Sequence, residues 1–264
     1  MSSSFERITS FQNTRVKQIK RLRERKARDR EGRFVIDDGR DLERALDCGY
    51  TVDYAFYCPE IGPEPLLDRL PANAVYYVSR DILEKVSYRQ SPSPVVAVME
   101  QKPSRGVDDL RQQAGSLILA LVQVEKPGNI GALLRTADAT GFATICLIDT
   151  PLDITNPNVI RSSTGACFLG NIYTLSSAEA VAFFSESGHN IVAAVVDGEH
   201  DLYDVDLRQP TVIVLGAEDR GLPPVWVEQA NQRVSIPMAG RLSDSLNVSV
   251  SGAVMMYEAL RQRR

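Results

Sequence analysis

The chain has 264 residues, a formal net charge of −4, 44% hydrophobic residues and 24% charged residues, the balance of an ordinary globular protein. It holds no run of eighteen apolar residues, so we expect no membrane span. The N-terminus carries no apolar segment of the secretory kind, and we expect a cytoplasmic protein. The length suffices for two compact domains or one large one.

Metal and disulfide chemistry are not expected. The two histidines stand alone, and no pair of cysteines has the spacing of a zinc site or of a disulfide framework. We therefore predict four reduced, mostly buried thiols. The cysteines are Cys48, Cys58, Cys146 and Cys167.

Positive charge is concentrated near the N-terminus, where Thr14–Glu31 is predicted to form one basic helix. From Arg7 to Arg33 there are eleven Lys or Arg residues against three Asp or Glu residues. A concentrated basic surface attracts a polyphosphate through counterion release. Charge alone leaves two alternatives, an RNA-binding surface and a solvated helix face.

Strands and helices alternate through the first hundred residues, which favours an α/β sandwich. Strands are predicted at Phe34–Ile36, Tyr54–Cys58, Val75–Val78 and Val95–Met99. Helices are predicted at Asp41–Cys48, Pro65–Leu70 and Arg80–Val86. A polar stretch with Pro and Gly, Gln101–Asp109, is typical of a linker, and we place a domain boundary between residues 105 and 106.

A second α/β domain with a parallel sheet is predicted over residues 106–264. Near-continuous apolar runs are typical of strands buried on both faces of a parallel sheet. They lie at Leu117–Val124, Ala143–Ile148, Ile191–Val196 and Val212–Leu215, with a helix predicted at Ala178–Glu186. A last helix carries one apolar face, made of Leu246, Val250, Ala253, Val254, Tyr257 and Leu260.

The segment Val124–Phe142 combines a strand end, a Pro-Gly-Asn turn and a helix. The turn places Asn129 at a helix N-terminus, a position that suits an anion or the polar end of a ligand. Arg135 follows six residues later among apolar neighbours. It lies either at the edge of a cleft or on an ordinary helix surface.

The segment Val212–Leu222 runs from a buried strand into a loop that holds Gly216, Glu218 and Gly221. Ligands of parallel α/β sheets bind at this carboxyl edge of the strands. We expect Gly216 to let a ligand approach the backbone and Gly221 to adopt a positive φ. The loop matches neither a dinucleotide-binding fingerprint nor a P-loop.

The segment Val234–Tyr257 passes from an apolar strand through Pro237 and a polar loop into the last helix. Asp244 or Ser245 is predicted to be the N-cap of this helix. Asn247 is expected in the first helical turn.

In this order and spacing the three segments resemble the SpoU (TrmH-type) family of knotted SPOUT methyltransferases, over about 150 residues. The matching residues are Asn129, Arg135, Gly216, Glu218, Gly221, Leu222, Ile236, Pro237, Met238 and Ser245 to Ser249. Asn158–Gly165 also resembles the family's Arg-x-Ser-x-Gly loop. The basic N-terminal stretch resembles the ribosomal-protein-like, RNA-binding domain that precedes many such catalytic domains. Two departures are Asp38, where the family has Glu, and a loop at Gly240–Ser245 that is one residue longer.

The resemblance implies a trefoil-knotted catalytic domain that moves a methyl group from S-adenosylmethionine to a ribose 2′-hydroxyl of structured RNA. It implies a homodimer, no metal, and ribosomal RNA rather than transfer RNA as the substrate. Its catalytic residues are Arg135, Asn129, Glu218, Ser245 and Asn247. Its cofactor-binding residues are Leu215, Gly216, Gly221, Ile236, Met238, Ser245 and Leu246. Its RNA-binding residues are Arg15, Lys17, Lys20, Arg21, Arg23 and Arg161.

The family's proposed base matches Arg135, but a guanidinium group loses its proton only at considerable cost. Arg135 therefore has an alternative role, as a clamp on the phosphate beside the target ribose. Three rival functions stay open: a knotted RNA-binding protein without catalysis, a base-methylating enzyme of the same fold, and a nucleotide-binding oxidoreductase.

Overall fold

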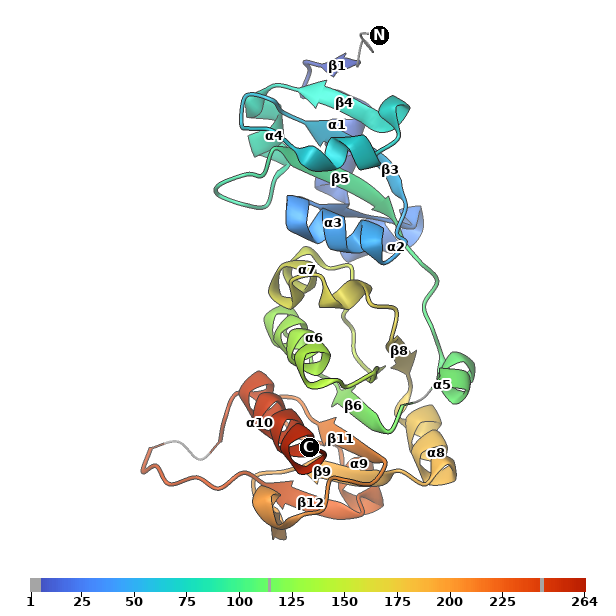
Figure 1. The fold of residues 1–264 in the computed structure, drawn as a ribbon, viewed down its shortest axis with the longest axis vertical. Coiled ribbons are helices and arrows are strands. Elements are labelled where there is room, and N and C mark those ends of the chain that lie inside the picture. Colours follow the sequence, from blue (N-terminus) through green and yellow to red (C-terminus); the bar gives the residue numbers. More distant parts are fainter. Residues whose placement is uncertain (1–5, 114, 243–244) are drawn as a thin grey trace. The chain divides into compact units, whose positions relative to one another are not determined.

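The computed structural model describes residues 6–113, 115–242 and 245–264, and the chain forms two compact units (Figure 1). The first unit comprises Met1–Pro103 and Asp153–Phe168, and the second comprises Ser104–Leu152 and Leu169–Arg264. The chain thus passes between the units after residues 103, 152 and 168. The segment Asp153–Phe168 belongs to the first unit by its contacts, although it lies inside the predicted second domain.

A mixed five-stranded sheet forms the centre of the first unit, in the order β1-β4-β3-β5-β2. Its strands are β1 (Arg7–Ile8), β2 (Arg33–Ile36), β3 (Val52–Tyr57), β4 (Val75–Val78) and β5 (Val95–Glu100). Its helices are α1 (Thr14–Arg21), α2 (Arg25–Glu31), α3 (Gly39–Asp47), α4 (Arg80–Val86) and α7 (Pro157–Ser163), with short 3-10 turns η1 (Pro65–Arg69), η2 (Ala72–Ala74) and η3 (Ala166–Phe168). The strands β1, β4 and β3 are parallel, whereas β5 runs antiparallel to β3 and β2. The predicted bounds of β4 and α4 are confirmed.

The predicted basic helix is in fact two helices, so the prediction of one helix over residues 14–31 is wrong. Arg28, in α2, closes the break, because its guanidinium donates to the carbonyl oxygens of Leu22 at 3.0 Å and Arg23 at 2.7 Å. The last carbonyls of a helix lack backbone donors within that helix, and this side chain supplies the missing partners. No Gly or Pro marks the break, so the sequence offers no local signal.

An apolar core holds α1 and α4 against the first sheet. Val16, Ile19 and Leu22 are buried in one cluster with side chains of α4 and of the central strands. A second contact, between aromatic rings, ties η3 to β2. The Phe168 ring stacks on Phe34 with 6.0 Å between centroids. The segment Asp153–Phe168 is therefore packed into the first unit and does not merely pass beside it.

The second unit is built on a seven-stranded parallel sheet in the order β10-β12-β9-β11-β6-β7-β8. Its strands are β6 (Leu117–Val122), β7 (Thr144–Ile148), β8 (Ile172–Leu175), β9 (Asn190–Ala194), β10 (His200–Asp201), β11 (Thr211–Leu215) and β12 (Gln232–Ser235). Its helices are α5 (Val107–Gln113), α6 (Pro127–Thr140), α8 (Ser177–Ser187), α9 (Pro224–Gln229) and α10 (Val248–Gln262), with the 3-10 turn η4 (Leu202–Asp204). The parallel sheet is confirmed, and every residue of β6, β7 and β11 is buried. The trefoil knot stays a prediction.

The helices α6 and α10 pack directly against each other. The contact depends on Gly252 of α10, because a Cβ atom there would lie 2.3 Å from Cδ2 of Leu133 and 2.8 Å from Cδ1 of Leu215. The face of α10 that meets its own unit is Val248, Gly252, Met255, Met256 and Ala259. On the other face, Val250 and Tyr257 are exposed, so the predicted apolar face is not the one that covers the sheet.

Other differences from prediction lie at short or edge elements. Pro65–Leu70 forms a 3-10 turn rather than an α-helix. The predicted linker Gln101–Asp109 already contains the start of α5. The strands β8 and β10 were not predicted; β10 has two residues and both strands lie at the edges of the sheet, where burial imposes a weak pattern.

Candidate active site

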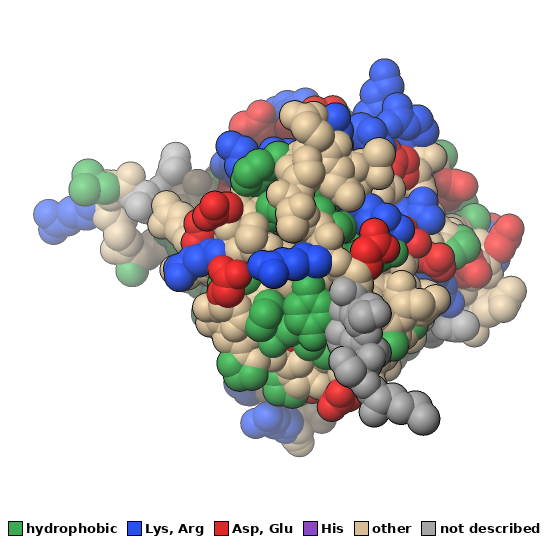
Figure 2. Space-filling model, turned by 90° about the horizontal axis from the view of Figure 1, so that it is seen from above, with side chains coloured by type: hydrophobic (Ala, Val, Ile, Leu, Met, Phe, Trp, Pro, Cys, Tyr) green, Lys and Arg blue, Asp and Glu red, His purple; other side chains and the backbone are tan. Residues whose placement is uncertain are grey.

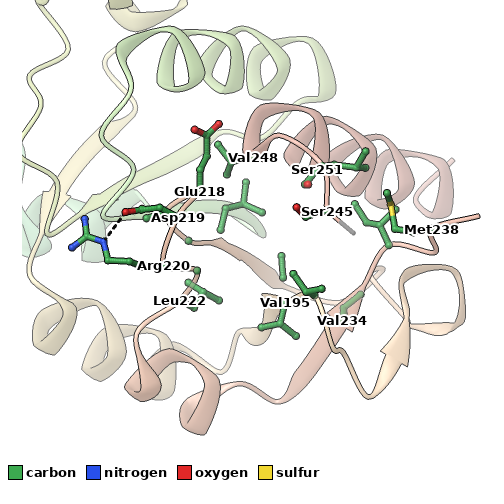
Figure 3. Close-up of a pocket in the computed structure, with 18 residues that line it drawn as sticks. Val195, Glu218, Asp219, Arg220, Leu222, Val234, Met238, Ser245, Val248 and Ser251 are labelled. Atoms are coloured by element: carbon green, nitrogen blue, oxygen red, sulfur yellow. Dashed lines mark ion pairs between the residues drawn. The ribbon is translucent and has the colours of Figure 1, made fainter. Parts of the chain in front are cut away.

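A cavity of about 420 Å³ opens at the carboxyl ends of three neighbouring strands, β9, β11 and β12 (Figure 3). Its lining comes from the segments that follow these strands and from the start of α10. In a parallel sheet this edge is where ligands bind, because the loops there are free to differ from one protein to the next. The volume falls within the range of small-molecule sites, about 300–1,000 Å³.

All the residues predicted from the resemblance to hold the cofactor line this cavity. They are Leu215, Gly216, Gly221, Ile236, Met238, Ser245 and Leu246. Glu218, Leu222 and Val248, which belong to the matched motifs, also line it, whereas sequence reasoning missed Ala194, Val195, Val196, Ala217, Asp219, Arg220, Val234 and Ser251. A usable signal existed for Val195 and Val196, because they follow an apolar strand of the same parallel sheet. Their assignment to that strand was wrong, since β9 ends at Ala194.

The glycines after β11 form a tight turn at the mouth of the cavity. A Cβ atom at Gly216 would lie 2.4 Å from the carbonyl carbon of Gly221 and 2.6 Å from the nitrogen of Leu222. The space on the Cβ side of Gly216 is therefore filled by the chain itself, while the residue lines the cavity, and the approach of a ligand to its backbone stays a prediction. The expectation for Gly221 is confirmed, because its φ is +66°.

The Glu218 carboxylate is the acceptor for three side chains from distant parts of the sequence. Asn129 Nδ2 donates to its Oε1 at 2.6 Å, and the Asn247 amide donates to the same oxygen. Lys126 Nζ donates to Oε2. The pKa of Glu218 is lowered, first by the bond from Lys126 and further by the bond from Asn129, against the opposing effect of burial. The cluster thus holds a carboxylate in its charged form.

The last helix begins two or three residues later than predicted. Its N-cap is Asn247, whose Oδ1 accepts from the backbone N–H of Ser249 at 3.0 Å and from the Ser249 hydroxyl at 2.6 Å. This corrects the expectation that Ser245 or Asp244 is the cap; Asp244 lies outside the described residues. Asn247 therefore does two things, since its oxygen starts α10 and its nitrogen reaches Glu218.

Arg135 is exposed on α6, two turns from the Asn129 end of the helix. Among the residues that the structure describes, it makes no hydrogen bond or ion pair. Six residues of α-helix correspond to about 9 Å along the axis and about a third of a turn from Asn129 around it. Within the second unit Arg135 is thus separate from the Glu218 cluster, and its guanidinium faces solvent.

Several of the residues predicted to contact RNA are engaged inside the first unit. The Arg15 guanidinium lies 4.2 Å from the Tyr76 ring centroid. Arg21 donates to Glu31 at 2.8 Å, a bond that lowers the pKa of Glu31 to about 2. These arginines already have partners within the folded unit, so less of their positive charge is available to RNA.

Lys17, Lys20 and Arg161 have no ion pair among the described residues. Figure 2 shows a face on which Lys and Arg side chains are interspersed with Asp and Glu side chains. Positive charge is therefore not uniform on this face. A contact with RNA at this end must use particular side chains.

No helix within residues 6–113, 115–242 and 245–264 is long and apolar enough to cross a membrane. Over the same residues, no group of three or more His, Cys, Asp or Glu side chains is placed to hold a metal ion. All four cysteines are free, and three of them, Cys58, Cys146 and Cys167, are buried. The prediction of mostly buried thiols is confirmed.

Comparison with known proteins finds two family models along the chain. Residues 116–257 match the SpoU rRNA Methylase family, and residues 13–97 match the MRM3-like substrate binding domain. The first match spans more than half of the chain. Both matches agree with the two resemblances drawn from the sequence.

The chain is also similar over its whole length to individual proteins. It is 34% identical to an uncharacterized tRNA/rRNA methyltransferase of Synechocystis, covering 100% of this chain and 96% of that protein. It is 31% identical to the 23S rRNA (uridine(2479)-2′-O)-methyltransferase of Streptomyces viridochromogenes, covering 97% and 92%. The crystal structure of an AdoMet-bound rRNA methyltransferase from Sinorhizobium meliloti superposes with a TM-score of 0.87 at 28% identity, covering 98% of each chain. The chain belongs to the SpoU rRNA methylase family.

Proposed function

We propose that this protein transfers the methyl group of S-adenosylmethionine to a ribose 2′-hydroxyl of ribosomal RNA. One observation carries the proposal: Asn129, Glu218 and Asn247 meet beside the cavity that holds every predicted cofactor residue. Each of the three comes from a different motif of the family. The named activity of the Streptomyces relative, 2′-O-methylation of 23S rRNA, agrees with this reaction.

The cavity fits S-adenosylmethionine. Apolar side chains of Leu215, Val234 and Ile236 suit the faces of an adenine ring, and the exposed backbone after each strand offers donors and acceptors to its edge. Ser245 and Ser251 lie close together on one side of the cavity (Figure 3). The bound group supplies an activated methyl, so the protein's own part is to align the ribose and to help its hydroxyl lose a proton.

The Glu218 cluster is suited to positioning. Its carboxylate already accepts from Lys126, Asn129 and Asn247, so these side chains hold one another in place beside the cavity. A network whose members are all paired is rigid, and rigidity is what alignment of two reactants requires. We assign the three residues the role of fixing the edge of the site on which the nucleotide rests.

Arg135 is assigned to the RNA. Its guanidinium faces solvent without a partner among the described residues, so it is available to a phosphate of the substrate or to the oxygen that accepts the methyl group. The two roles differ in the protonation of Arg135. As a base its guanidinium must first lose a proton, whereas as a phosphate clamp it stays protonated throughout.

The proposal includes a homodimer. Val250 and Tyr257, two turns apart on α10, are exposed apolar side chains, 46% and 54% exposed. A second copy of the chain is the occupant that the family resemblance implies for this face of α10. A cytoplasmic location is also part of the proposal, since ribosomal RNA is found there.

The test uses S-adenosylmethionine labelled in its methyl group, together with separate samples of 23S rRNA, 16S rRNA and transfer RNA. After alkaline hydrolysis, label should appear in dinucleotides, because a 2′-O-methyl group blocks cleavage of the neighbouring bond. We expect such dinucleotides from a ribosomal RNA sample.

Each rival gives a different result. Label in alkali-released mononucleotides indicates a base methyltransferase. Label in the transfer RNA sample alone means that transfer RNA, and not ribosomal RNA, is the substrate. RNA binding without any transfer of label indicates a binding protein. Either the first or the last result overturns the proposal.

A further inference from the structure

Tyr88, in the loop that follows α4, is held in a fixed position although it is only half buried. Its backbone N–H donates to Oδ2 of Asp37 at 2.7 Å, and the Ser87 hydroxyl donates to the same oxygen at 3.0 Å. One carboxylate thus ties the start of this loop to the end of β2. The aromatic ring is presented by a rigid backbone and keeps part of its surface exposed.

A guanidinium group lies against this ring. The central carbon of the Arg23 guanidinium is 4.5 Å from the Tyr88 ring centroid, a cation–π distance. Nη2 of Arg23 donates to the carbonyl oxygens of Val86 at 3.1 Å and Ser87 at 2.9 Å. Arg23 is therefore fixed to the same loop and brings its positive charge to the ring.

A second positive charge is carried by a helix from a remote part of the sequence. Helix α7 contacts β2, and Asp37 at the end of β2 holds the backbone of Tyr88. Burial raises the pKa of the Tyr88 hydroxyl, and the positive charges of Arg23 and Arg161 act against this rise. Arg161 is exposed in the last turn of α7 and has no ion pair among the described residues. The half-buried ring therefore lies against one structural cation, Arg23, and the helix that packs on β2 carries a second cation that is available.

A buried ion pair sets the place of α7. Nη2 of Arg28 lies 2.7 Å from Oδ2 of Asp153, and the Arg28 side chain is only 1% exposed. Oδ1 of Asp153 accepts from the Thr155 hydroxyl at 2.7 Å, whose oxygen accepts from Gln101 at 2.9 Å. These bonds fix the segment that carries Arg161 to α2, which follows the turn that carries Arg23.

We propose that Tyr88 and Arg161 form a binding site for an unpaired nucleotide of the RNA substrate, with Arg23 backing the tyrosine ring. A base stacks on Tyr88, and the adjoining phosphate pairs with Arg161. The inference rests on the proposed function for the class of ligand. Its chemistry is that of RNA recognition in loops and bulges, where aromatic rings and guanidinium groups receive unstacked bases.

The site also assigns a positioning role to the pair of Arg28 and Asp153. Neither side chain needs to touch RNA, because Arg28 is buried. Their ion pair keeps Arg161 beside Tyr88. The two halves of the site come from sequence positions more than seventy residues apart, which explains why a search for one basic segment does not find it.

The experiment measures affinity of the full-length protein for a fluorescein-labelled single-stranded RNA 12-mer and for its duplex, by anisotropy. Tyr88→Ala should weaken binding of the single strand about 5- to 100-fold, the measured range for loss of one stacked base. Tyr88→Phe should bind as the parent, since the ring is retained. Tyr203→Ala, which removes an exposed tyrosine of the second unit, is the matched control.

Arg161→Ala should weaken binding and reduce the dependence of log affinity on log salt by about one. Arg69→Ala, which removes an exposed arginine elsewhere in the first unit, should leave that slope unchanged. Asp153→Asn should raise the KM for RNA while kcat and the Kd for S-adenosylmethionine stay near the parental values. The melting temperature should fall in either case, because buried Arg28 loses its counter-ion, but a general structural fault would also lower kcat and raise the Kd for S-adenosylmethionine.

Parental RNA affinity in both Tyr88→Ala and Arg161→Ala overturns the inference, as does equal weakening by Tyr88→Phe. This failure is separate from failure of the proposed function. If the parent methylates ribose while Tyr88→Ala binds RNA normally, the nucleotide site is refuted and the proposed function stands. If the parent transfers no methyl group to any RNA, the proposed function itself fails.

Discussion

The side-chain amides of Asn129 and Asn247 meet although 118 positions separate them in the sequence: Nδ2 of Asn247 lies 3.3 Å from Oδ1 of Asn129. Both amide nitrogens also donate to Oε1 of Glu218. The Asn129 amide therefore has one possible orientation, with its nitrogen toward the carboxylate and its oxygen toward Asn247. Three motifs of the family thus depend on one another through hydrogen bonds that have a defined direction.

Replacing Glu218 by Gln should slow methylation about 10- to 100-fold, because hydrogen bonds to a charged group contribute about 1.5–3 kcal/mol each. A glutamine oxygen lacks the charge that Lys126 neutralises, and its NH2 group opposes the two asparagine amides. Single-turnover methylation of ribosomal RNA measures the effect. Glu125→Gln, which changes an exposed carboxylate on the Arg220 side, should keep the parental rate.

The charge of Glu218 also sets a limit on pH dependence. Its pKa is lowered, so the bonds from Lys126 and Asn129 are present above the ordinary glutamate pKa and are lost only as the pH falls through the lower value. We therefore expect no step in the methylation rate from this group between about pH 5 and 8. A step in that range that disappears in Glu218→Gln would contradict the assignment.

Substitution of Arg135 by Ala should abolish methylation while leaving the protein folded, because the side chain is exposed and unpaired among the described residues. The Kd for S-adenosylmethionine should stay within about twofold of the parent, and thermal unfolding should shift by no more than about 2 °C. Arg135→Lys distinguishes the two roles. A clamp keeps part of its activity as lysine at unchanged pH dependence, whereas a base with a different proton affinity shifts the pH–rate profile.

Gly216→Ala should damage the cofactor cavity. The new Cβ would lie 2.4 Å from the Gly221 backbone, and that backbone cannot move without opening the turn at the mouth of the cavity. We expect at least a tenfold loss of S-adenosylmethionine affinity by calorimetry, together with a lower melting temperature. Gly240→Ala, at a glycine with nothing within 4 Å of the added carbon, is the control and should match the parent.

Asp41 is a source of pH-dependent instability in the first unit. Burial, with the neighbouring charge of Asp38, raises the pKa of Asp41 to about 6. A raised pKa means that the folded state binds the proton more tightly, so stability is full below the unfolded pKa and falls as the pH rises through 6. A shift of about two units corresponds to up to about 3 kcal/mol.

Asp41→Asn should therefore melt above the parent at pH 8, with the gain shrinking below about pH 5. Thermal unfolding followed by circular dichroism at pH 4, 6 and 8 is the measurement. Asp53→Asn is a control, because that carboxylate is more exposed and pairs with Arg33. An Asp41→Asn gain that is the same at all three pH values would point to packing rather than to charge.

Val250→Glu should convert the proposed dimer into a monomer. The side chain is 46% exposed on the face of α10 that does not pack on its own unit, so a charge there costs the isolated chain little but opposes burial against a second copy. Sedimentation at micromolar concentration reads the mass, and methylation should fall with it. Tyr203→Glu, at an exposed side chain outside α10, should leave both unchanged. A parental protein that sediments as a monomer refutes the dimer.

Much of the second unit could be predicted from sequence because its signals are local. The apolar runs that became β6 and β11 are buried on both faces, and such strands need no partner residue to be recognised. The cavity residues could be assigned from the family resemblance, whose second and third motifs follow the carboxyl ends of β11 and β12. Gly221 could be expected to have a positive φ from its place in a turn.

What could not be predicted depends on contacts between distant residues. The break between α1 and α2 is closed by Arg28 across six residues, and no propensity marks it. Lys126 could not be recognised as a partner of Glu218, since 92 positions separate them. The sequence also does not show which face of α10 packs inward. Both faces of the helix are largely apolar, and only Gly252 distinguishes them.

Because Asp153–Phe168 belongs to the first unit, that unit cannot finish folding early in translation. When Pro103 has been made, Arg28 still lacks Asp153 and Phe34 still lacks Phe168. A buried cation without its counter-ion is strongly unfavourable, so this unit cannot reach its final packing then. Translation must continue for another sixty-five residues before the missing segment exists. The N-terminal part of the chain is thus made first but completed late.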